Sequence, residues 1–128
     1  MKSPALLVLV FAALASAVLA KAPELRAGAA AVDITPTQFP MNMPGGFSAN
    51  MAEKAHDPFH SRALVLDDGG TALAMVVVDN LGAGPEVLNE AKALAAERTG
   101  MKPENMLISS THTHSGPSVN PRSESATT

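Results

Sequence analysis

The sequence predicts an α/β fold built on a mixed sheet, in which a β-hairpin is followed by a right-handed β-α-β unit. The hairpin is indicated by strand-like segments at 61–67 and 71–79 that an Asp-Gly-Gly turn at 68–70 connects, a strong hairpin signal. The β-α-β unit is indicated by a helical pattern at 85–99, between the second of these strands and a short apolar strand at 105–110. Strands connected in this way are expected to be parallel, with a right-handed crossover.

Residues 1–20 have the pattern of a cleaved signal peptide. One early cation, Lys2, precedes an uncharged apolar run from Ala5 to Ala20, and small residues at its end suit a signal-peptidase site. The run is shorter than the roughly 20 apolar residues that span a bilayer, which favours cleavage over an uncleaved anchor. We therefore expect an exported protein, secreted or periplasmic, with no transmembrane segment after cleavage.

The composition excludes several classes of protein. The formal net charge is −3, no basic residues cluster, and the chain has no Tyr or Trp on which bases could stack, so nucleic acid is not an expected partner. The absence of Cys excludes a lipoprotein signal and disulfide bonds. An exported chain of this size must then be stabilised by a packed core, by a metal or by additional chain.

The N-terminal half of the mature chain is predicted to form one strand and a long loop. The strand covers 25–35 and is closed by Pro36. A loop is expected at 37–59, because its prolines interrupt regular elements and its glycine pair at 45–46 adopts conformations that other residues avoid. The loop is apolar, so it covers either the protein core or one side of an apolar substrate cleft. Its large apolar residues are Phe39, Met41, Met43, Phe47 and Met51.

The helix at 85–99 has clear boundaries and one apolar stripe. Pro85 suits the first helical position, Glu86 complements the helix dipole there, and Gly100 ends the helix. The stripe faces the sheet, while the charged residues face solvent. Its members are Val87, Leu88, Ala91, Leu94 and Ala95.

Polar residues follow the two strands of the β-α-β unit. The strand at 71–79 is apolar on both faces, as in a central strand covered on both sides, and it ends at Asp79. The strand at 105–110 is followed by a Thr-His-Thr-His segment. Ligands gather at the carboxyl ends of parallel strands. In an extended chain His112 and His114 point to the same side, about 6.6 Å apart, where both can bind one metal, or one can bind metal while the other hydrogen-bonds a substrate.

Less specific readings apply to each of these side chains. A His-x-His pair alone is often a structural surface feature, but its place after a buried strand and beside Asp79 favours metal binding. Asp79 can be a ligand, or it can bond the backbone amides of the turn at 81–82, and we favour the structural role. His56 and His60 flank Pro58 and cannot share a helical face, so they are expected to be plain loop residues.

These segments resemble a known family. ISSTHTHSGP at 108–117 looks like the signature of the neutral/alkaline, non-lysosomal ceramidases and their bacterial relatives, and GAAAVDITP at 28–36 is similar to the first strand of that family. The Met-Pro-Gly-Gly-Phe loop, SRALVL at 61–66 and VVVDNLG at 76–82 follow in the family's order. The resemblance covers nearly all of the mature chain, and THTHSGP is its specific part.

The resemblance implies a zinc amidase that splits the N-acyl bond of ceramide or a related lipid. His112 is then a zinc ligand, and His114 faces the substrate near the reacting carbonyl. It also implies a lipid or amide substrate and contact with a membrane surface. Residues 21–117 would be the N-terminal part of a larger catalytic domain, ahead of an irregular polar tail at 118–128. The remaining His, Glu and Tyr ligands of the family lie beyond this chain, which is expected to be inactive alone.

Two other hypotheses stay open. One is a non-catalytic exported binding or scaffold domain that kept the fold and lost the site. The other is a different His-x-His metallohydrolase, such as a phosphoesterase. The lack of an Asp-rich or Arg-rich anion site counts against the second.

Overall fold

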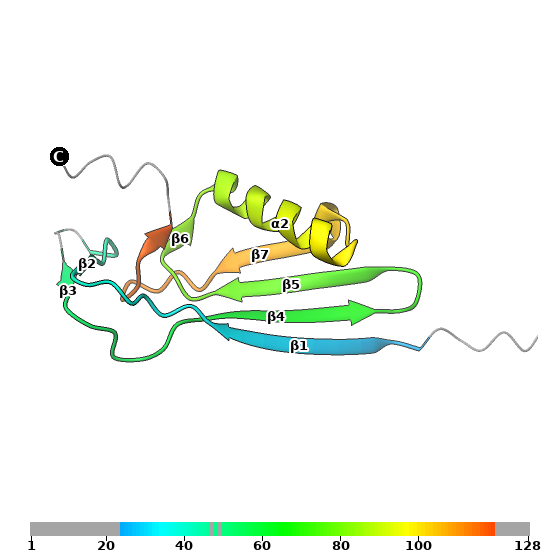
Figure 1. The fold of residues 1–128 in the computed structure, drawn as a ribbon, viewed down its shortest axis with the longest axis horizontal. Helices are drawn as coiled ribbons and strands as arrows, with labels where there is room; N and C mark the ends of the chain where they lie inside the picture. The colour runs from blue at the N-terminus through cyan, green and yellow to red at the C-terminus, as the bar shows by residue number, and fades with distance from the viewer. Residues whose placement is uncertain (1–23, 47, 49, 120–128) are drawn as a thin grey trace, which may run out of the picture.

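The computed structural model describes residues 24–46, 48 and 50–119, which form a mixed α/β fold (Figure 1). The predicted signal peptide at 1–20, Phe47 and the end of the tail at 120–128 lie outside these described residues. The main sheet has the strand order β1-β4-β5-β7, and α2 follows β5 in the chain. These elements are β1 (Arg26–Asp33), β4 (His60–Asp67), β5 (Ala72–Val78), α2 (Pro85–Thr99) and β7 (Met106–Ser110).

The pairing of the strands confirms the predicted mixed sheet. β1 with β4 and β4 with β5 are antiparallel, and β5 with β7 is parallel. The predicted turn between β4 and β5 is held by the Asp68 side chain, whose Oδ1 accepts hydrogen bonds from the backbone N–H groups of Gly70 (2.9 Å) and Thr71 (2.7 Å). Gly69 has a φ of 87°, a conformation that glycine adopts without steric cost.

The helix α2 has the boundaries that the sequence predicts. Pro85 occupies the first turn with Glu86, and Arg98 lies in the last turn, each charge complementing the helix dipole. Gly100 follows with a φ of 72° and donates its backbone N–H to the Ala96 carbonyl at 2.8 Å. This is the left-handed C-terminal cap for which glycine is preferred.

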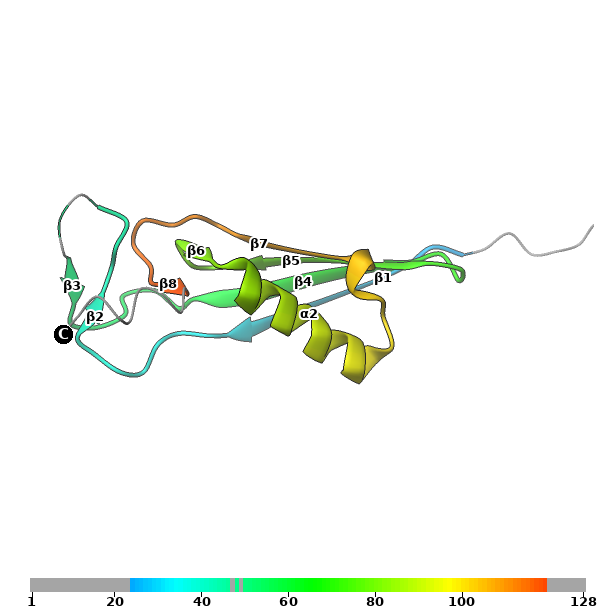
Figure 2. The same ribbon diagram turned by 90° about the horizontal axis from the view of Figure 1, so that it is seen from above.

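The helix covers one face of the sheet. In the two views of the ribbon, α2 lies to one side of β5 and β7 (Figures 1 and 2). Its Val87 and Leu88 approach the sheet beside Val78 and Ile108. No residue of α2 is buried, and Leu94 of the predicted stripe is 49% exposed. Of the stripe, Val87, Leu88 and Ala91 line the space between the helix and the sheet, whereas Leu94 lies largely in solvent.

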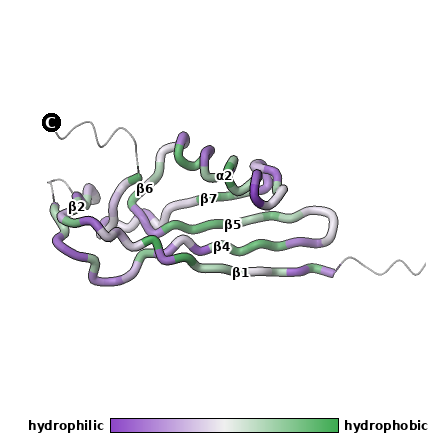
Figure 3. The backbone as a smooth tube through the Cα atoms, viewed as in Figure 1, coloured by the Kyte–Doolittle hydropathy of each residue, from purple (hydrophilic) through white to green (hydrophobic). Residues whose placement is uncertain are grey.

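The opposite face of the sheet is apolar and open, which corrects the expectation that β5 is covered on both sides. The register places Leu64, Met75 and Leu107 in one row across β4, β5 and β7, and they are 39%, 39% and 61% exposed. Leu73 and Val77 of β5 lie on the same face and are also exposed. Figure 3 shows hydrophobic colouring along most of β5. The described residues place no element over this face.

Short strand pairs replace two segments that were expected to be irregular. Within the predicted loop at 37–59, β2 (Met41–Asn42) pairs with β3 (Met51–Ala52). At the start of the predicted polar tail, β8 (Ser118–Val119) pairs in parallel with β6 (Gly82–Ala83). Backbone N–H and C=O groups that are removed from solvent need hydrogen-bond partners, which these short pairs provide. Strands of two residues are too short to show a periodic hydrophobic pattern in the sequence. A 3₁₀ turn, η2 (Pro103–Asn105), precedes β7.

Substitution of Gly100 by Ala should destabilise the protein. The left-handed conformation at this position costs a residue with a Cβ about 1 kcal/mol, so Gly100→Ala is expected to lower the free energy of unfolding by about that amount in urea denaturation. Gly28→Ala is the matched control, because a Cβ there meets nothing within 4 Å and its φ is not positive. An equal effect of the two substitutions would contradict this account of the helix end.

Candidate functional site

The segment at 111–117, here called the histidine loop, is held against the end of β5 by backbone hydrogen bonds. The N–H groups of Thr111 and Thr113 donate to the carbonyls of Val78 (2.9 Å) and Asn80 (3.2 Å). At the other end of the loop, the Leu81 N–H donates to the Pro117 carbonyl at 2.9 Å. These bonds continue the parallel pairing of β5 with β7 beyond the strands. The polar groups that follow the two strands are therefore brought together, as the sequence predicts.

His112 has a left-handed backbone and an anchored side chain. Its φ of 58° is uncommon for a residue with a Cβ. The ring Nδ1 lies 2.7 Å from the Leu81 carbonyl oxygen. A carbonyl only accepts hydrogen bonds, so Nδ1 carries the proton and donates it. In the neutral imidazole Nε2 then keeps a free lone pair, the arrangement that orients histidine ligands in metal sites.

The two imidazoles meet, but not as an extended strand would place them. The ring centroids of His112 and His114 lie 5.1 Å apart with an interplanar angle of 83°, an edge-to-face contact. Both residues are exposed. The prediction that the chain is extended here is wrong, because His112 has a left-handed backbone. The prediction that the two rings lie on a common side stays consistent with this contact.

The long loop packs directly on the backbone of His114. A Cβ built on Gly45 would lie 2.5 Å from the Cα and 2.6 Å from the carbonyl oxygen of His114. Only glycine fits in this contact, since real Cβ atoms do not approach backbone so closely. Gly45, expected to allow an unusual loop conformation, therefore also allows close packing of the long loop against the histidine loop.

A cleft of about 410 Å³ opens between the same two segments. One wall is formed by Asp79 with Thr113 and Ser115, the alternate side chains of the histidine loop. His112 and His114 are absent from its lining. Met43 is buried in the core, as one of the two readings of the apolar loop expects, and it also lines the cleft. The long loop supplies the rest of the lining: Met43, Asn50, Ala52, Lys54, Ala55, His56, Asp57, Pro58 and Phe59.

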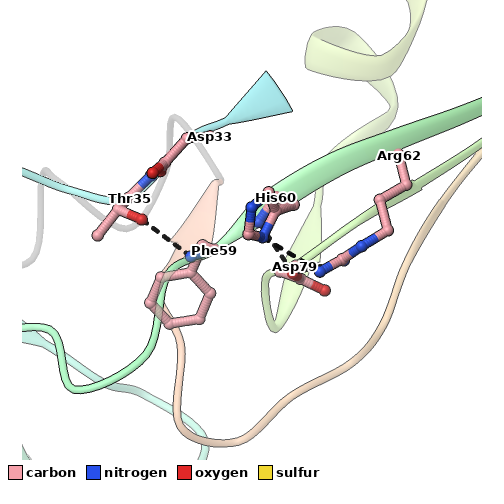
Figure 4. A network of polar contacts seen from close by, with 6 residues as sticks. All are labelled: Asp33, Thr35, Phe59, His60, Arg62 and Asp79. Atoms are coloured by element: carbon pink, nitrogen blue, oxygen red, sulfur yellow. Dashed lines mark hydrogen bonds and ion pairs between the residues drawn. The ribbon is translucent and has the colours of Figure 1, made fainter. Parts of the chain in front are cut away.

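Asp79 is held by partners on β4 (Figure 4). Its Oδ2 accepts hydrogen bonds from the His60 backbone N–H (2.9 Å) and from Arg62 Nη1 (2.7 Å). Partial burial opposes ionisation, but these hydrogen bonds and the positive charge of Arg62 outweigh it and hold the pKa of Asp79 below its ordinary value. The structural role favoured for Asp79 is present, although its partners lie on β4 and not in the turn at 81–82.

The same network reaches across the sheet to β1. Thr35 Oγ1 accepts the Phe59 backbone N–H at 2.9 Å, and Asp33 Oδ1 accepts the Thr35 N–H at 2.8 Å. Hydrogen bonding by the Thr35 hydroxyl, and secondly by its backbone N–H, lowers the pKa of Asp33. The backbone N–H groups of Phe59 and His60, through which the chain enters β4, are therefore both held by side-chain oxygens, of Thr35 and of Asp79 (Figure 4).

His56 and His60 lie outside the histidine loop and have different surroundings. His56 is an exposed loop residue, as predicted, with Nδ1 3.2 Å from Asp57 Oδ2. His60 is not in the loop but is the first residue of β4. Its Nδ1 lies 3.1 Å from Arg62 Nη2, and arginine only donates, so Nδ1 is the acceptor. The sequence prediction for His60 is therefore wrong in its element.

The site lacks a complete set of metal ligands within the described residues. There, no group of three or more His, Cys, Asp or Glu side chains is placed to hold a metal ion. His112 is thus one oriented nitrogen donor, with His114 beside it.

In the described part of the chain, no helix has the length and apolar character needed to cross a membrane.

Sequence reasoning missed three contributors to this site. Thr113 and Ser115 line the cleft. The alternation of side chains that places the two histidines on one side of the chain places these two residues on the opposite side, and this was the signal that could have found them. Arg62, which holds Asp79, left no motif in the sequence, because its partner comes from a different strand.

In comparisons with protein-family models, curated proteins and solved structures, nothing matches this chain.

Replacing Gly45 by Ala should disturb the histidine loop. The added methyl group would overlap the backbone of His114. The backbone shifts that remove such an overlap typically lower the free energy of unfolding by about 1–3 kcal/mol. We expect a lower midpoint of urea unfolding and altered NMR signals of the His112 and His114 rings. Gly46→Ala is the control, because its nearest neighbour would be the Ser48 carbonyl oxygen at 3.7 Å. Unchanged ring signals in Gly45→Ala would show that the contact does not position His114.

Removing the charge of Asp79 should change how stability depends on pH. The pKa of this carboxyl is lowered in the folded chain, so the unfolded chain binds more protons in acid. Its contribution is complete above the ordinary carboxyl pKa of about 3.9 and is lost as the pH falls through the lowered value. Asp79→Asn should cost about 1 kcal/mol in urea denaturation at neutral pH, discounted for the half-exposed Arg62, and less near pH 3.

The matched control for this substitution is Asp57→Asn. The Asp57 side chain is 87% exposed and pairs only with the exposed His56 among the described residues, so its neutralisation should change stability little at either pH. If Asp79→Asn and the unmodified chain lose equal stability between neutral pH and about pH 3, the ion pair of Asp79 does not stabilise the fold.

Proposed function

We propose that this chain supplies the metal-binding and substrate-facing histidines of an exported zinc-dependent amidohydrolase similar to neutral ceramidases. The reaction would be hydrolysis of the N-acyl amide bond of ceramide or a related lipid. The single observation that carries the proposal is the geometry of His112, whose Nδ1 is committed to the Leu81 carbonyl at 2.7 Å. This anchors the ring on the protein and leaves Nε2 as the donor atom.

The chemistry of His112 fits zinc. Zinc sites use neutral imidazole nitrogen, and a backbone carbonyl bonded to the other ring nitrogen is a usual means of fixing a ligand histidine. Catalytic zinc sites typically have three protein ligands, so the proposal requires further ligands outside the described group. When bound, zinc supplies Lewis-acid chemistry that polarises a carbonyl oxygen.

His114 is proposed to face the substrate. Its ring lies beside that of His112, and its backbone is fixed by the contact with Gly45. An attacked amide develops negative charge on its carbonyl oxygen, and a preorganised hydrogen-bond donor stabilises that charge. A second imidazole next to the zinc ligand is suited to donate such a bond. Its fixed backbone means that little reorganisation is needed when the charge develops.

The composition of the cleft supports an amphipathic substrate. Met43 and Phe59 give it an apolar side, while Asn50 and Lys54 give it polar groups. A molecule with a hydrocarbon part and a polar amide end can use both kinds of surface. The position of Thr113 and Ser115 in its wall makes it adjacent to the histidines along the chain. We assign this cleft to the part of the substrate next to the amide.

The proposal includes a larger catalytic domain, with residues 21–117 as its N-terminal part and a right-handed β5-α2-β7 crossover. The open face of the sheet supports this. Contiguous exposed apolar surface usually marks a place where other protein packs, and Leu64, Met75 and Leu107 form such a row. In the described residues, the buried apolar side chains are only Met43, Ala74 and Met106. Additional layers would complete both this core and the ligand set.

The proposal is tested by zinc content and amide hydrolysis in the product of the intact open reading frame. Fluorescent ceramide is the substrate, and bound zinc is measured by mass spectrometry after dialysis. His112→Ala should lower zinc affinity at least tenfold, as loss of a metal ligand or its support does, and activity should fall with it. His114→Ala should keep zinc and lose hydrolysis by about 100-fold or more.

Glu90→Ala is the control for both variants, because Glu90 is an exposed residue of α2 and does not line the cleft. It should leave zinc content and hydrolysis unchanged. Zinc binding without turnover of ceramide would move the substrate to another amide or, if a phosphoester is cleaved, to another reaction. A folded, monodisperse protein that binds no zinc would contradict the proposal and favour a binding or scaffold domain.

A further inference from the structure

Asp79 offers one fixed carboxylate oxygen to the cleft beside the histidine loop. Its Oδ2 is occupied, because it accepts hydrogen bonds from the His60 backbone N–H and from Arg62, whereas its Oδ1 makes none within the described residues. There, the buried side-chain atoms that lack a partner are limited to Asn80 Oδ1, so Asp79 Oδ1 keeps contact with solvent. Because Asp79 lines the cleft, this oxygen is available to a ligand.

The charges of the cleft do not favour a ligand of one sign. Arg62 compensates Asp79 through an ion pair of 2.7 Å, and Asp57 lies 3.2 Å from His56. Lys54 also lines the cleft. A free anion would meet the two carboxylates, and a free cation would meet Lys54. A neutral ligand whose groups both donate and accept hydrogen bonds can use all of these side chains without repulsion.

The uncharged polar groups of the lining suit several ligand hydroxyls at once. Thr113 Oγ1 accepts the Ser115 backbone N–H at 3.3 Å, which leaves the hydroxyl proton of Thr113 free to donate. The Ser115 hydroxyl and the Asn50 side-chain amide make no hydrogen bond within the described residues. A hydroxyl or an amide group both donates and accepts. Together with Asp79 Oδ1, these groups can bind a ligand that carries hydroxyls on several sides.

Phe59 adds a fixed aromatic ring to the same cleft. Its backbone N–H donates to Thr35 Oγ1 at 2.9 Å. Its ring packs against Gly116, where a built Cβ would lie 3.2 Å from the ring Cε1, and Gly116 is itself buried. Met43 contributes further apolar surface to the lining. The C–H face of a sugar ring can pack on such a surface while the hydroxyls at its rim reach the polar groups.

We propose that this cleft binds a neutral pyranose sugar. Asp79 Oδ1 accepts from the sugar hydroxyls, and Phe59 packs against the apolar face of the ring. The cleft volume of about 410 Å³ lies within the range of small-molecule sites. The place of the sugar, attached next to the amide of the substrate, rests on the proposed function. Binding of the sugar itself requires neither zinc nor hydrolysis.

The first test compares three probes on the full chain: methyl glucopyranoside, cyclohexanol and glucuronate. Binding is followed by NMR titration of the backbone amides of Thr113 and Ser115. Methyl glucopyranoside should saturate with a Kd of about 1 mM, as the usual affinity per atom gives for its size. Cyclohexanol, with a single hydroxyl, should bind at least about tenfold more weakly. Equal affinities of these two, tighter binding of glucuronate, or no saturable binding of methyl glucopyranoside would overturn the proposal.

Substitutions localise the binding. Asp79→Asn should weaken the affinity for methyl glucopyranoside about tenfold, because a hydrogen bond to a charged acceptor is lost, and Ser115→Ala should weaken it about threefold. Thr71→Val is the control, since Thr71 is exposed in the hairpin turn and lies outside the lining. If Asp79→Asn fails to fold, the comparison of Ser115→Ala with Thr71→Val still decides. Unchanged binding in a folded Ser115→Ala protein would refute the assignment.

The outcomes separate this inference from the proposed hydrolase. Binding of methyl glucopyranoside by a chain that holds no zinc would support the sugar site and contradict the hydrolase. Hydrolysis of ceramide by a protein that does not bind the sugar would refute the sugar site alone. In an active protein, an N-acyl lipid with a glucosyl group should have a kcat/KM at least about tenfold above that of ceramide. Equal values would overturn the assignment of the sugar to the substrate.

Discussion

The rest of the structure depends on the backbone hydrogen bonds that join the segment after β5 to the segment after β7. The parallel pairing brings two chain ends to one edge of the sheet, and bonds from Thr111, Thr113 and Leu81 continue it past the last strand residues. The same run of chain that anchors these bonds supplies the carbonyl that orients His112. A bond pattern of the backbone, rather than a cluster of side chains, therefore builds the site.

This arrangement divides the histidine loop between two kinds of environment. His112 and His114 point to an exposed region where their rings touch, whereas Thr113 and Ser115 line a cleft with Asp79 and the long loop. Gly45 connects the two, because it packs against the backbone of His114 while its own loop lines the cleft. A substrate that spans both regions would place its reacting group at the histidines and its flanking part in the cleft.

The described residues bury little, and both unusual surfaces follow from that. Only Met43, Ala74 and Met106 are buried apolar residues there. Among the described residues, the helix α2 covers part of one sheet face and leaves a cavity beneath it, while the other face stays apolar and open. Because burial of apolar area is the main favourable term in folding, such a sheet gains stability from anything that covers the open face or fills the cavity.

The sequence by itself determined the elements of the main sheet, the limits of α2 and the meeting of the polar strand ends, because hydrophobic period, the turn at 68–70 and the caps at Pro85 and Gly100 are local signals. Only the tertiary structure decided the left-handed backbone of His112, the two short strand pairs and the link of Asp79 to Arg62. These depend on contacts between segments distant in the chain, whose energies leave no local pattern. For the same reason the sequence could not reveal that one face of β5 is uncovered: burial is a property of neighbours, not of a strand alone.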